Sequence, residues 1–238
     1  MTSPPSASTE LIDDLVTANH ILVHEGVLDG FGHVSVRHDR RDDRFLIARS
    51  MAPALVSAQD ILECDFDGVP RDPHGRHTYV ERFIHSAIYQ ARPDVRAVIH
   101  SHSPAIIPFG VTGARLRPIC HMSGFLGSTT PVFEIRNSAG ESTDLLIRSQ
   151  ALGVALARTL GQAAVALMRG HGSVAVGVSL RQVVYRAIYT ESNARLQSEA
   201  MRFGDVNYLT DAEAASTAAM IDEHLDRPWE MWKQQVRT

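Results

Sequence analysis

The chain has 238 residues, of which 44% are hydrophobic, and a formal net charge of -4 at pH 7. This length and apolar content suit one domain with a substantial core, and the charge does not favour binding to nucleic acid or to an anionic membrane. No apolar run is long enough for a transmembrane helix and there are only two cysteines, so we expect a cytoplasmic protein that does not act at a membrane.

The N-terminal segment is expected to be followed by a helix. Residues 1–8 are rich in Ser and Pro and are predicted to be disordered, whereas residues 9–238 are predicted to form a single domain. Thr9 can cap a helix whose apolar residues recur at helical spacing, and Gly26 or Gly30 lies near its end.

Strands are predicted next. In His33–Arg37 the valines alternate with polar residues, which predicts a half-buried strand, and Phe45–Ala48 is expected to be its hairpin partner. A loop, Arg49–Val56, precedes a third strand at Leu62–Phe66. An antiparallel sheet therefore begins here.

A helix and a buried strand then lead to two histidines. Helical spacing predicts a helix that starts at Thr78 and stops at Pro93, and the apolar Val95–Ile99 predicts a buried strand. His100 and His102 follow this strand. Side chains two apart on an extended segment point to the same side, so both imidazoles can converge on a metal ion, or they can be two hydrogen-bonded turn residues.

The middle of the chain has less regular patterns. Pro104 is expected to start a short helix, and the best strand between residues 115 and 135 is Pro131–Ile135. Ser149 is predicted to cap a helix that ends at Leu160.

The last third alternates strands and helices. We predict a buried strand at Val165–Met168, then a strand with Val174 and Val176 facing inward. Ser179 is predicted to cap a long helix, and Asp211 to open a last helix.

The chain closes on P-W-E-M-W, and its tryptophans are expected to pack on another surface, such as a neighbouring subunit. The elements together indicate an α/β domain with a mostly antiparallel sheet.

Two further residues can complete a metal site. His171 lies between two glycines in R-G-H-G, where the backbone can approach closely, although it can also be a turn histidine. Glu81 lies ahead of the His100 strand, and its carboxylate can bind a metal or form a capping box with Thr78. His85, one helical turn after Glu81, is a candidate to support it.

The motifs taken together resemble the class II aldolase and adducin family over about Leu11 to Leu225. They are G-H-V-S-V-R after the first helix, Glu81 before the strand, V-I-H-S-H-S, and M-R-G-H-G followed by a long helix. The resemblance implies a single α/β/α domain, a homotetramer, and one divalent metal ion per subunit held by Glu81, His100, His102 and His171.

Departures from the family pattern suggest a different substrate. Aldolases of the family hold a sugar phosphate with an Asn in G-N-x-S, a T-P-S-G-like loop, and small hydroxyl residues before the glutamate. Here His33 replaces the Asn, R-S-M-A-P-A-L replaces the loop, and Tyr79-Val80 precedes Glu81. The predicted substrate contacts suit a flat carboxylate; they are Arg49, Ser50, Met51, Tyr79 and Arg82.

The same motifs resemble the decarboxylase branch of the family, which includes decarboxylases of hydroxypyridine dicarboxylates and dihydroxyphthalates. This resemblance implies a metal-dependent, non-oxidative decarboxylase of an aromatic hydroxy-dicarboxylate. His33 or Glu81 is the candidate proton carrier, and Arg49 or Arg82 can pair with the second carboxylate, although each can also have a structural role.

Two alternatives stay open. One is a class II aldolase or epimerase that acts on a small hydroxy-carbonyl compound or a sugar phosphate, and the other is a non-haem iron oxygenase that acts on a hydroxybenzoate-type compound. Three imidazoles and a carboxylate suit zinc, manganese or iron, so the ligand types do not select the metal.

Overall fold

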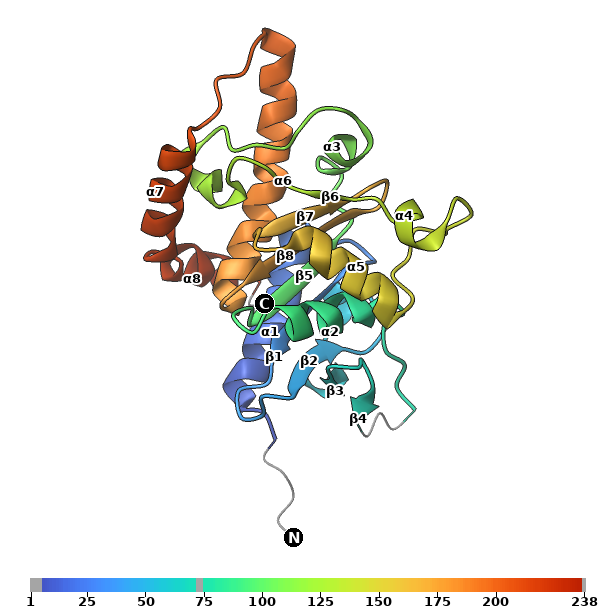
Figure 1. The fold of residues 1–238 in the computed structure, drawn as a ribbon. Helices are drawn as coiled ribbons and strands as arrows, with labels where there is room; N and C mark the ends of the chain where they lie inside the picture. Colours follow the sequence, from blue (N-terminus) through green and yellow to red (C-terminus); the bar gives the residue numbers. More distant parts are fainter. Residues whose placement is uncertain (1–5, 72–74, 237–238) are drawn as a thin grey trace.

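A computed structural model describes residues 6–71 and 75–236. Within these residues, eight strands form one sheet in the order β4-β3-β2-β1-β5-β8-β7-β6, with helices on both faces (Figure 1). The predicted α/β fold is confirmed. Most of the segment predicted to be disordered, residues 1–8, lies outside the described residues.

Half of the sheet is a run of antiparallel strands from the N-terminal part of the chain. These are β1 (His33–Arg37), β2 (Arg44–Ala48), β3 (Ile61–Asp65) and β4 (Pro70–Arg71). The prediction that β1 is half-buried is wrong, because all of its residues are buried. Helices cover both faces of the sheet at this strand, so the polar residues of β1 also lie inside the protein.

The other half contains β5 (Ala97–Ser101), β8 (Gly172–Gly177), β7 (Val165–Met168) and β6 (Val132–Phe133). β5 pairs antiparallel with both β1 and β8. At the edge, however, β6 runs parallel to β7, so the sheet is mixed. The prediction of a mostly antiparallel sheet is corrected at this edge, where a two-residue strand gives no periodic signal in the sequence.

The helices form a layer on each face. On one face, α2 (Arg82–Ala91) packs against α5 (Gln150–Leu160), with α4 (Arg136–Ala139) beside them. Their apolar side chains pack against strand residues that point to this face, such as Val98, Val174 and Val176, and together they form one hydrophobic core.

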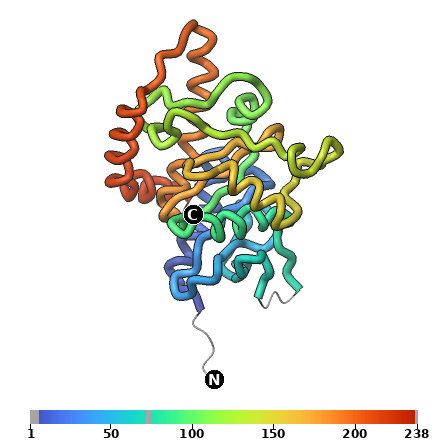
Figure 2. Tube along the Cα trace, in the orientation of Figure 1, coloured from blue at the N-terminus to red at the C-terminus, as the bar shows by residue number. Residues whose placement is uncertain are grey.

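The other face is covered by α1 (Thr9–His24), α6 (Leu180–Phe203) and α8 (Asp226–Gln235). α3 (Ile107–Val111) and α7 (Asp211–Asp222) complete the described α-helices. Three short 3-10 helices lie at Pro53–Leu55, Ala58–Asp60 and His121–Leu126. Figure 2 shows α6 extending away from the N-terminal strands, and the chain then returning to α7.

Several helix starts follow the predicted capping chemistry. Ser149 and Ser179 cap α5 and α6, as predicted. The first helix is capped by Ser8 instead of Thr9, because the Ser8 hydroxyl accepts from the Leu11 N–H. α2 begins at Arg82 and not at Thr78, which leaves Glu81 at its N-cap position.

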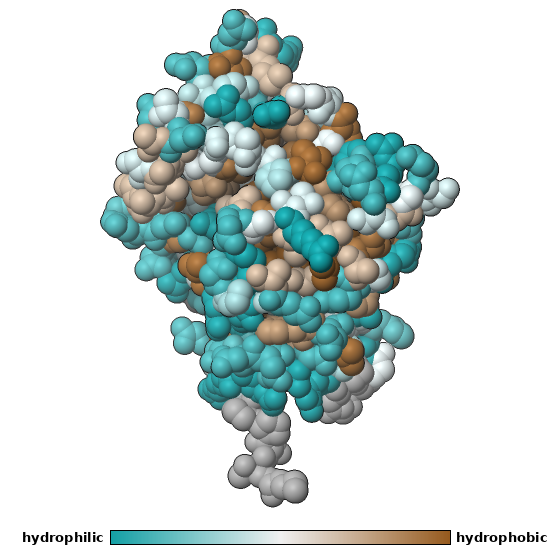
Figure 3. Space-filling view, in the orientation of Figure 1, coloured by the Kyte–Doolittle hydropathy of each residue, from teal (hydrophilic) through white to brown (hydrophobic). Residues whose placement is uncertain are grey.

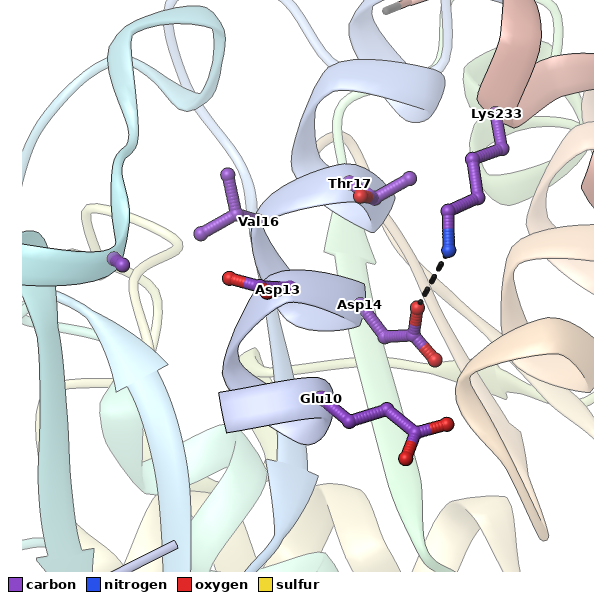
Figure 4. A pocket seen from close by; sticks show the side chains of 7 residues that line it. Glu10, Asp13, Asp14, Val16, Thr17 and Lys233 are labelled. Carbon is purple, nitrogen blue, oxygen red and sulfur yellow. Dashed lines mark hydrogen bonds and ion pairs between the residues drawn. The ribbon is translucent and has the colours of Figure 1, made fainter. Parts of the chain in front are cut away.

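The C-terminal tryptophans pack inside this chain. Trp229 and Trp232 of α8 are 0% and 3% exposed, so they pack as expected, but against this chain's own core and not on a neighbouring subunit. α8 lies against α1 and α6, and Lys233 pairs with Asp14 at 3.3 Å (Figure 4). The short helix thus completes the core over α1.

The visible surface is mixed in character. In Figure 3 the lower part of the molecule is mostly hydrophilic, whereas apolar residues are more frequent above it. None of the helices within residues 6–71 and 75–236 has the length and apolar character needed to cross a membrane.

Candidate metal centre

Four side chains from three parts of the fold converge beside the end of β5. Glu81 comes from the start of α2, His100 from β5, His102 from the residue after β5, and His171 from the turn between β7 and β8. Their ligand atoms all lie within 4.8 Å of one another. These are the four residues that the sequence predicts as ligands; that they bind a metal stays a prediction.

The strand register explains why the histidines meet. His100 pairs with Val174 of β8, and the His171 turn lies just ahead of that strand. A side chain at Gly172 would collide with the carbonyl oxygen of Ser101, so only glycine lets β8 approach β5 this closely. The turn is closed by a hydrogen bond from the His171 N–H to the Met168 carbonyl.

The far side of three of the four predicted ligands is tied to the backbone. His100 Nδ1 lies 3.0 Å from the Ser173 carbonyl, and His171 Nδ1 lies 3.0 Å from the Leu145 carbonyl. A carbonyl only accepts, so both Nδ1 atoms carry hydrogen and both Nε2 atoms offer a lone pair. Glu81 Oε1 accepts from the Ile147 N–H at 2.8 Å, and no capping hydrogen bond is formed by Glu81.

The side-chain atoms that face one another in the cluster have too few hydrogens for all of them to be hydrogen-bonded. His102 Nε2 lies 3.1 Å from His100 Nε2 and 3.0 Å from His171 Nε2, while Glu81 Oε2 lies 3.5 Å from both of those nitrogens. His102 Nε2 can supply one hydrogen to this cluster, but three acceptor atoms face it. A divalent cation resolves the excess of lone pairs, so the residues fit a metal ion.

The charge states also suit a ligand set. Burial acts to raise the pKa of Glu81, but the imidazoles of His100 and His171 beside its carboxylate hold that pKa well below its usual range. Burial, together with the neighbouring His100 and His171, lowers the pKa of His102 to about 4. Near neutral pH the site therefore presents an ionised carboxylate and an unprotonated His102.

A cavity of about 420 Å³ opens beside this cluster. It contains three predicted substrate contacts, Ser50, Met51 and Tyr79, together with His33 and two of the ligands. The full set of described residues that line it is Gly30, Phe31, Gly32, His33, Ser50, Met51, Ala52, Tyr79, Val80, Glu81, His102 and Leu146. Its wall is thus largely aromatic and apolar, and it adjoins the ligand atoms of Glu81 and His102.

Two ring side chains, Tyr79 and Phe31, contribute to this wall. The Tyr79 ring is tilted against that of His33, with ring centroids 4.6 Å apart, and its hydroxyl donates to the Met51 carbonyl at 2.7 Å. Burial raises the pKa of Tyr79 to about 12. Phe31 is 70% exposed, and its ring centroid lies 6.3 Å from that of His102.

The two predicted arginine contacts lie outside this lining. Arg49 Nε donates to Asp60 at 2.7 Å, and Arg82 donates to the Gly68 and Tyr79 carbonyls at 2.7 and 3.1 Å. A role in binding a carboxylate would require each guanidinium to exchange these partners. Neither Lys nor Arg is present among the described residues that line the cavity.

Sequence reasoning missed the group of residues behind His33. His85, the candidate to support Glu81, instead lies 2.6 Å from His33 Nδ1 through its Nε2 atom. Burial lowers the pKa of His33 well below its ordinary value and that of His85 to about 3. The only signal for this contact is that His33 and Ser35 share one face of a strand while His85 and Tyr89 share one face of a helix.

Comparison with known proteins places these features in a family. A family model described as the class II aldolase and adducin N-terminal domain matches residues 13–198. Decarboxylase tropJ from Talaromyces stipitatus is 39% identical, over 94% of this chain and 92% of that protein. A 3,4-dihydroxyphthalate decarboxylase from Terrabacter sp. is 29% identical, over 91% of this chain and 90% of that protein.

A solved structure shares the fold. L-fuculose 1-phosphate aldolase from Glaciozyma antarctica superposes with a TM-score of 0.79 and covers 98% of this chain and 93% of its own. At 23% sequence identity, this likeness supports the fold alone.

Proposed function

This chain belongs to the class II aldolase and adducin family, and we propose that it is a metal-dependent, non-oxidative decarboxylase of an aromatic hydroxy-dicarboxylate. The observation that carries the proposal is the position of the ligand cluster. Four ligand atoms converge beside a cavity that Glu81 and His102 help to line, and most of the other lining side chains are rings or apolar. The decarboxylases among its relatives support the same reaction class.

We assign Glu81, His100, His102 and His171 to hold the metal. When bound there, a divalent ion would polarise substrate oxygens and stabilise the negative charge left as CO2 departs. Zinc, manganese and iron all suit this donor set.

The remaining cavity residues are assigned to the substrate. Tyr79, Phe31 and Met51 offer a surface for a flat ring, and Ser50 lies in the same wall. Decarboxylation breaks the bond from ring carbon to carboxylate carbon, and the electron pair stays on the ring carbon, which then takes a proton.

His33 is the residue we assign to hold the group that returns this proton. Both oxygens of Glu81 are already engaged, one by the Ile147 N–H and one by the histidine cluster. His33 lines the cavity and its Nδ1 is occupied by His85, so Nε2 is the nitrogen left to hold a substrate hydroxyl group or a water.

The aldolase alternative is less well supported. A sugar phosphate needs several donors or cations around its phosphoryl oxygens, and the described lining of the cavity offers no Lys or Arg. We also propose a cytoplasmic homotetramer; light scattering should then give four times the chain mass of 26.1 kDa.

Metal analysis combined with CO2 release tests the proposal. We expect about one divalent ion per chain, and CO2 from a hydroxypyridine or hydroxybenzene dicarboxylate under argon. His171→Ala should lose metal and activity together, whereas His121→Ala, at an exposed histidine outside the site, should retain both.

Two results would contradict the proposal separately. If His171→Ala still bound one metal ion per chain, the assignment of His171 as a metal ligand would be wrong. Turnover of a phosphorylated sugar aldehyde, with none of the hydroxyaryl carboxylates, would replace the decarboxylase by an aldolase. A strict requirement for oxygen would favour the oxygenase.

A further inference from the structure

Behind the cavity, four buried polar side chains form a row that the metal site does not use. His33 and Ser35 are two apart on β1, and His85 and Tyr89 are four apart on α2. Two residues that are two apart on a strand point to the same face, and so do two residues that are four apart on a helix. The distance between the two side chains is similar in both cases, about 6 to 7 Å, so the two pairs alternate where α2 packs on the sheet.

The row is continuous and dry. His33 Nδ1 lies 2.6 Å from His85 Nε2, His85 Nδ1 lies 2.6 Å from Ser35 Oγ, and Ser35 Oγ lies 2.7 Å from the Tyr89 hydroxyl. The last three side chains are at most 1% exposed. Each of the three hydrogen bonds is short. Because these groups are buried, each polar atom must find its donor or acceptor within the protein and not in bulk water.

The far end determines the direction of the row. Within the described residues, Ser35 Oγ is the one hydrogen-bond acceptor for the Tyr89 hydroxyl; the Val98 backbone N–H that also faces the phenol oxygen is a donor. A buried hydroxyl without an acceptor is costly, so Tyr89 donates to Ser35. Burial raises the pKa of Tyr89 well above its ordinary value, and the phenol therefore keeps its hydrogen.

Every later link follows from the first. Ser35 accepts from Tyr89 and uses its own hydrogen on His85 Nδ1. His85 then carries its hydrogen on Nε2 and donates to His33 Nδ1, which leaves the hydrogen of His33 on Nε2. That nitrogen is the one left for a ligand in the cavity, which His33 lines.

We propose that Tyr89, Ser35 and His85 are positioning residues that fix the tautomer of His33, so that its Nε2–H hydrogen is aimed into the cavity, where it donates to a substrate oxygen. The identity of that oxygen rests on the proposed function, whereas the direction of the row does not. A donor without positive charge suits this position because the His33 ring lies 5.1 Å from that of His100, one of the residues we assign to hold the divalent ion, which would repel a second positive charge.

Neutron diffraction from deuterium-exchanged crystals of the metal-loaded protein reads the direction without any assay. We expect deuterium on Nε2 of His33 and of His85, and the Ser35 deuterium on the line to His85 Nδ1. Deuterium on His33 Nδ1 would overturn the proposal, whatever the enzyme proves to catalyse.

A matched pair of variants tests the consequence for catalysis. The amide of His85→Gln can still donate to His33 Nδ1, whereas His85→Leu cannot. We expect His85→Leu to lose about 10- to 100-fold in kcat, the range typical of lost supporting hydrogen bonds, and His85→Gln to lose much less.

Equal kcat values for two well-folded variants would overturn the positioning role. If His85→Leu does not fold, Ser35→Ala breaks the row at the next link and should show the same fall in kcat. Absence of decarboxylase activity in the wild-type protein, with the expected deuterium positions, would instead overturn the proposed function alone.

Discussion

Three histidines at the site, His33, His100 and His171, each have one nitrogen tied to the fold, and the partner of that nitrogen determines what the other one can do. His100 and His171 donate from Nδ1 to backbone carbonyls, so each Nε2 is a lone pair that suits a cation. His33 instead accepts at Nδ1 in the proposed arrangement, so its Nε2 is a donor. In the proposed site the same residue type is thereby divided between metal binding and substrate contact.

At this scale the buried histidine pair predicts a dependence of stability on pH. His85 is fully buried, and its pKa falls from 6.5 to about 3, so the unfolded chain binds a proton that the folded protein does not. Above about pH 6.5 His85 is unprotonated in both states and does not lower the free energy of unfolding. As the pH falls from 6.5 toward 3, protonation of His85 in the unfolded chain lowers the free energy of unfolding by up to about 1.4 kcal/mol per pH unit.

Replacement of His85 should flatten this dependence. We expect the free energy of unfolding of His85→Gln, measured in urea at fixed protein concentration, to fall less steeply between pH 6.5 and 4.5 than that of the wild type. His24→Gln, at an exposed position, is the control and should keep the wild-type slope. Parallel curves for His85→Gln and the wild type would contradict the burial argument.

Among the elements, local chemistry predicted some boundaries well and others poorly. Ser149 and Ser179 were identifiable because a hydroxyl at the N-cap acts within three residues of its own position. The start of α2 was placed too early because Val80 continues the helical spacing, although the backbone becomes helical only after Glu81. Periodicity alone does not reveal where the backbone turns.

The candidate site shows the same division. Three of its four predicted ligand residues stand out in the sequence because H-S-H and G-H-G are unusual local patterns, whereas Glu81 has an ordinary helix-start context and gains its assignment from the family resemblance. Nothing local marks Ser35 or Tyr89, because their importance arises only when α2 is laid on β1. For the same reason Arg49 was assigned to the substrate, whereas tertiary packing gives it Asp60 as a partner.

α8 was not predicted as a helix, and its contribution to stability can be tested. Pro228 lies in the first turn of α8, where proline is tolerated. The helix places Trp229 and Trp232, three residues apart, on its buried side. Trp229→Ala should cost about 3–5 kcal/mol in the free energy of unfolding. Trp229→Phe should cost less, because it refills part of the space and removes an indole N–H that has no partner.

Met231→Ala is the matched control in the same helix. Met231 is 50% exposed, so its truncation should change the free energy of unfolding by no more than about 0.5 kcal/mol. A loss for Trp229→Ala as small as this would mean that α8 is not part of the cooperative core. Urea or thermal unfolding of the three variants measures this directly.

For the whole molecule, the ligand cluster joins segments that are far apart in the chain. Glu81 starts a helix on one face of the sheet, His100 and His102 lie at the end of a central strand, and His171 lies in a turn 69 residues after His102. The unfolded chain does not bring these side chains together, so an ion that binds them stabilises only the folded state.

Removal of the metal should therefore lower the melting temperature of the whole domain. At a metal concentration about 100 times Kd, binding contributes about 2.7 kcal/mol, which corresponds to roughly 5–10 °C for a chain of this size. Thermal scans with and without a chelator measure the shift. His171→Ala should have a lower melting temperature that no longer responds to the chelator, because it breaks the link between the β7–β8 turn and the rest of the cluster. An equal response in His171→Ala and the wild type would show that the ion binds elsewhere.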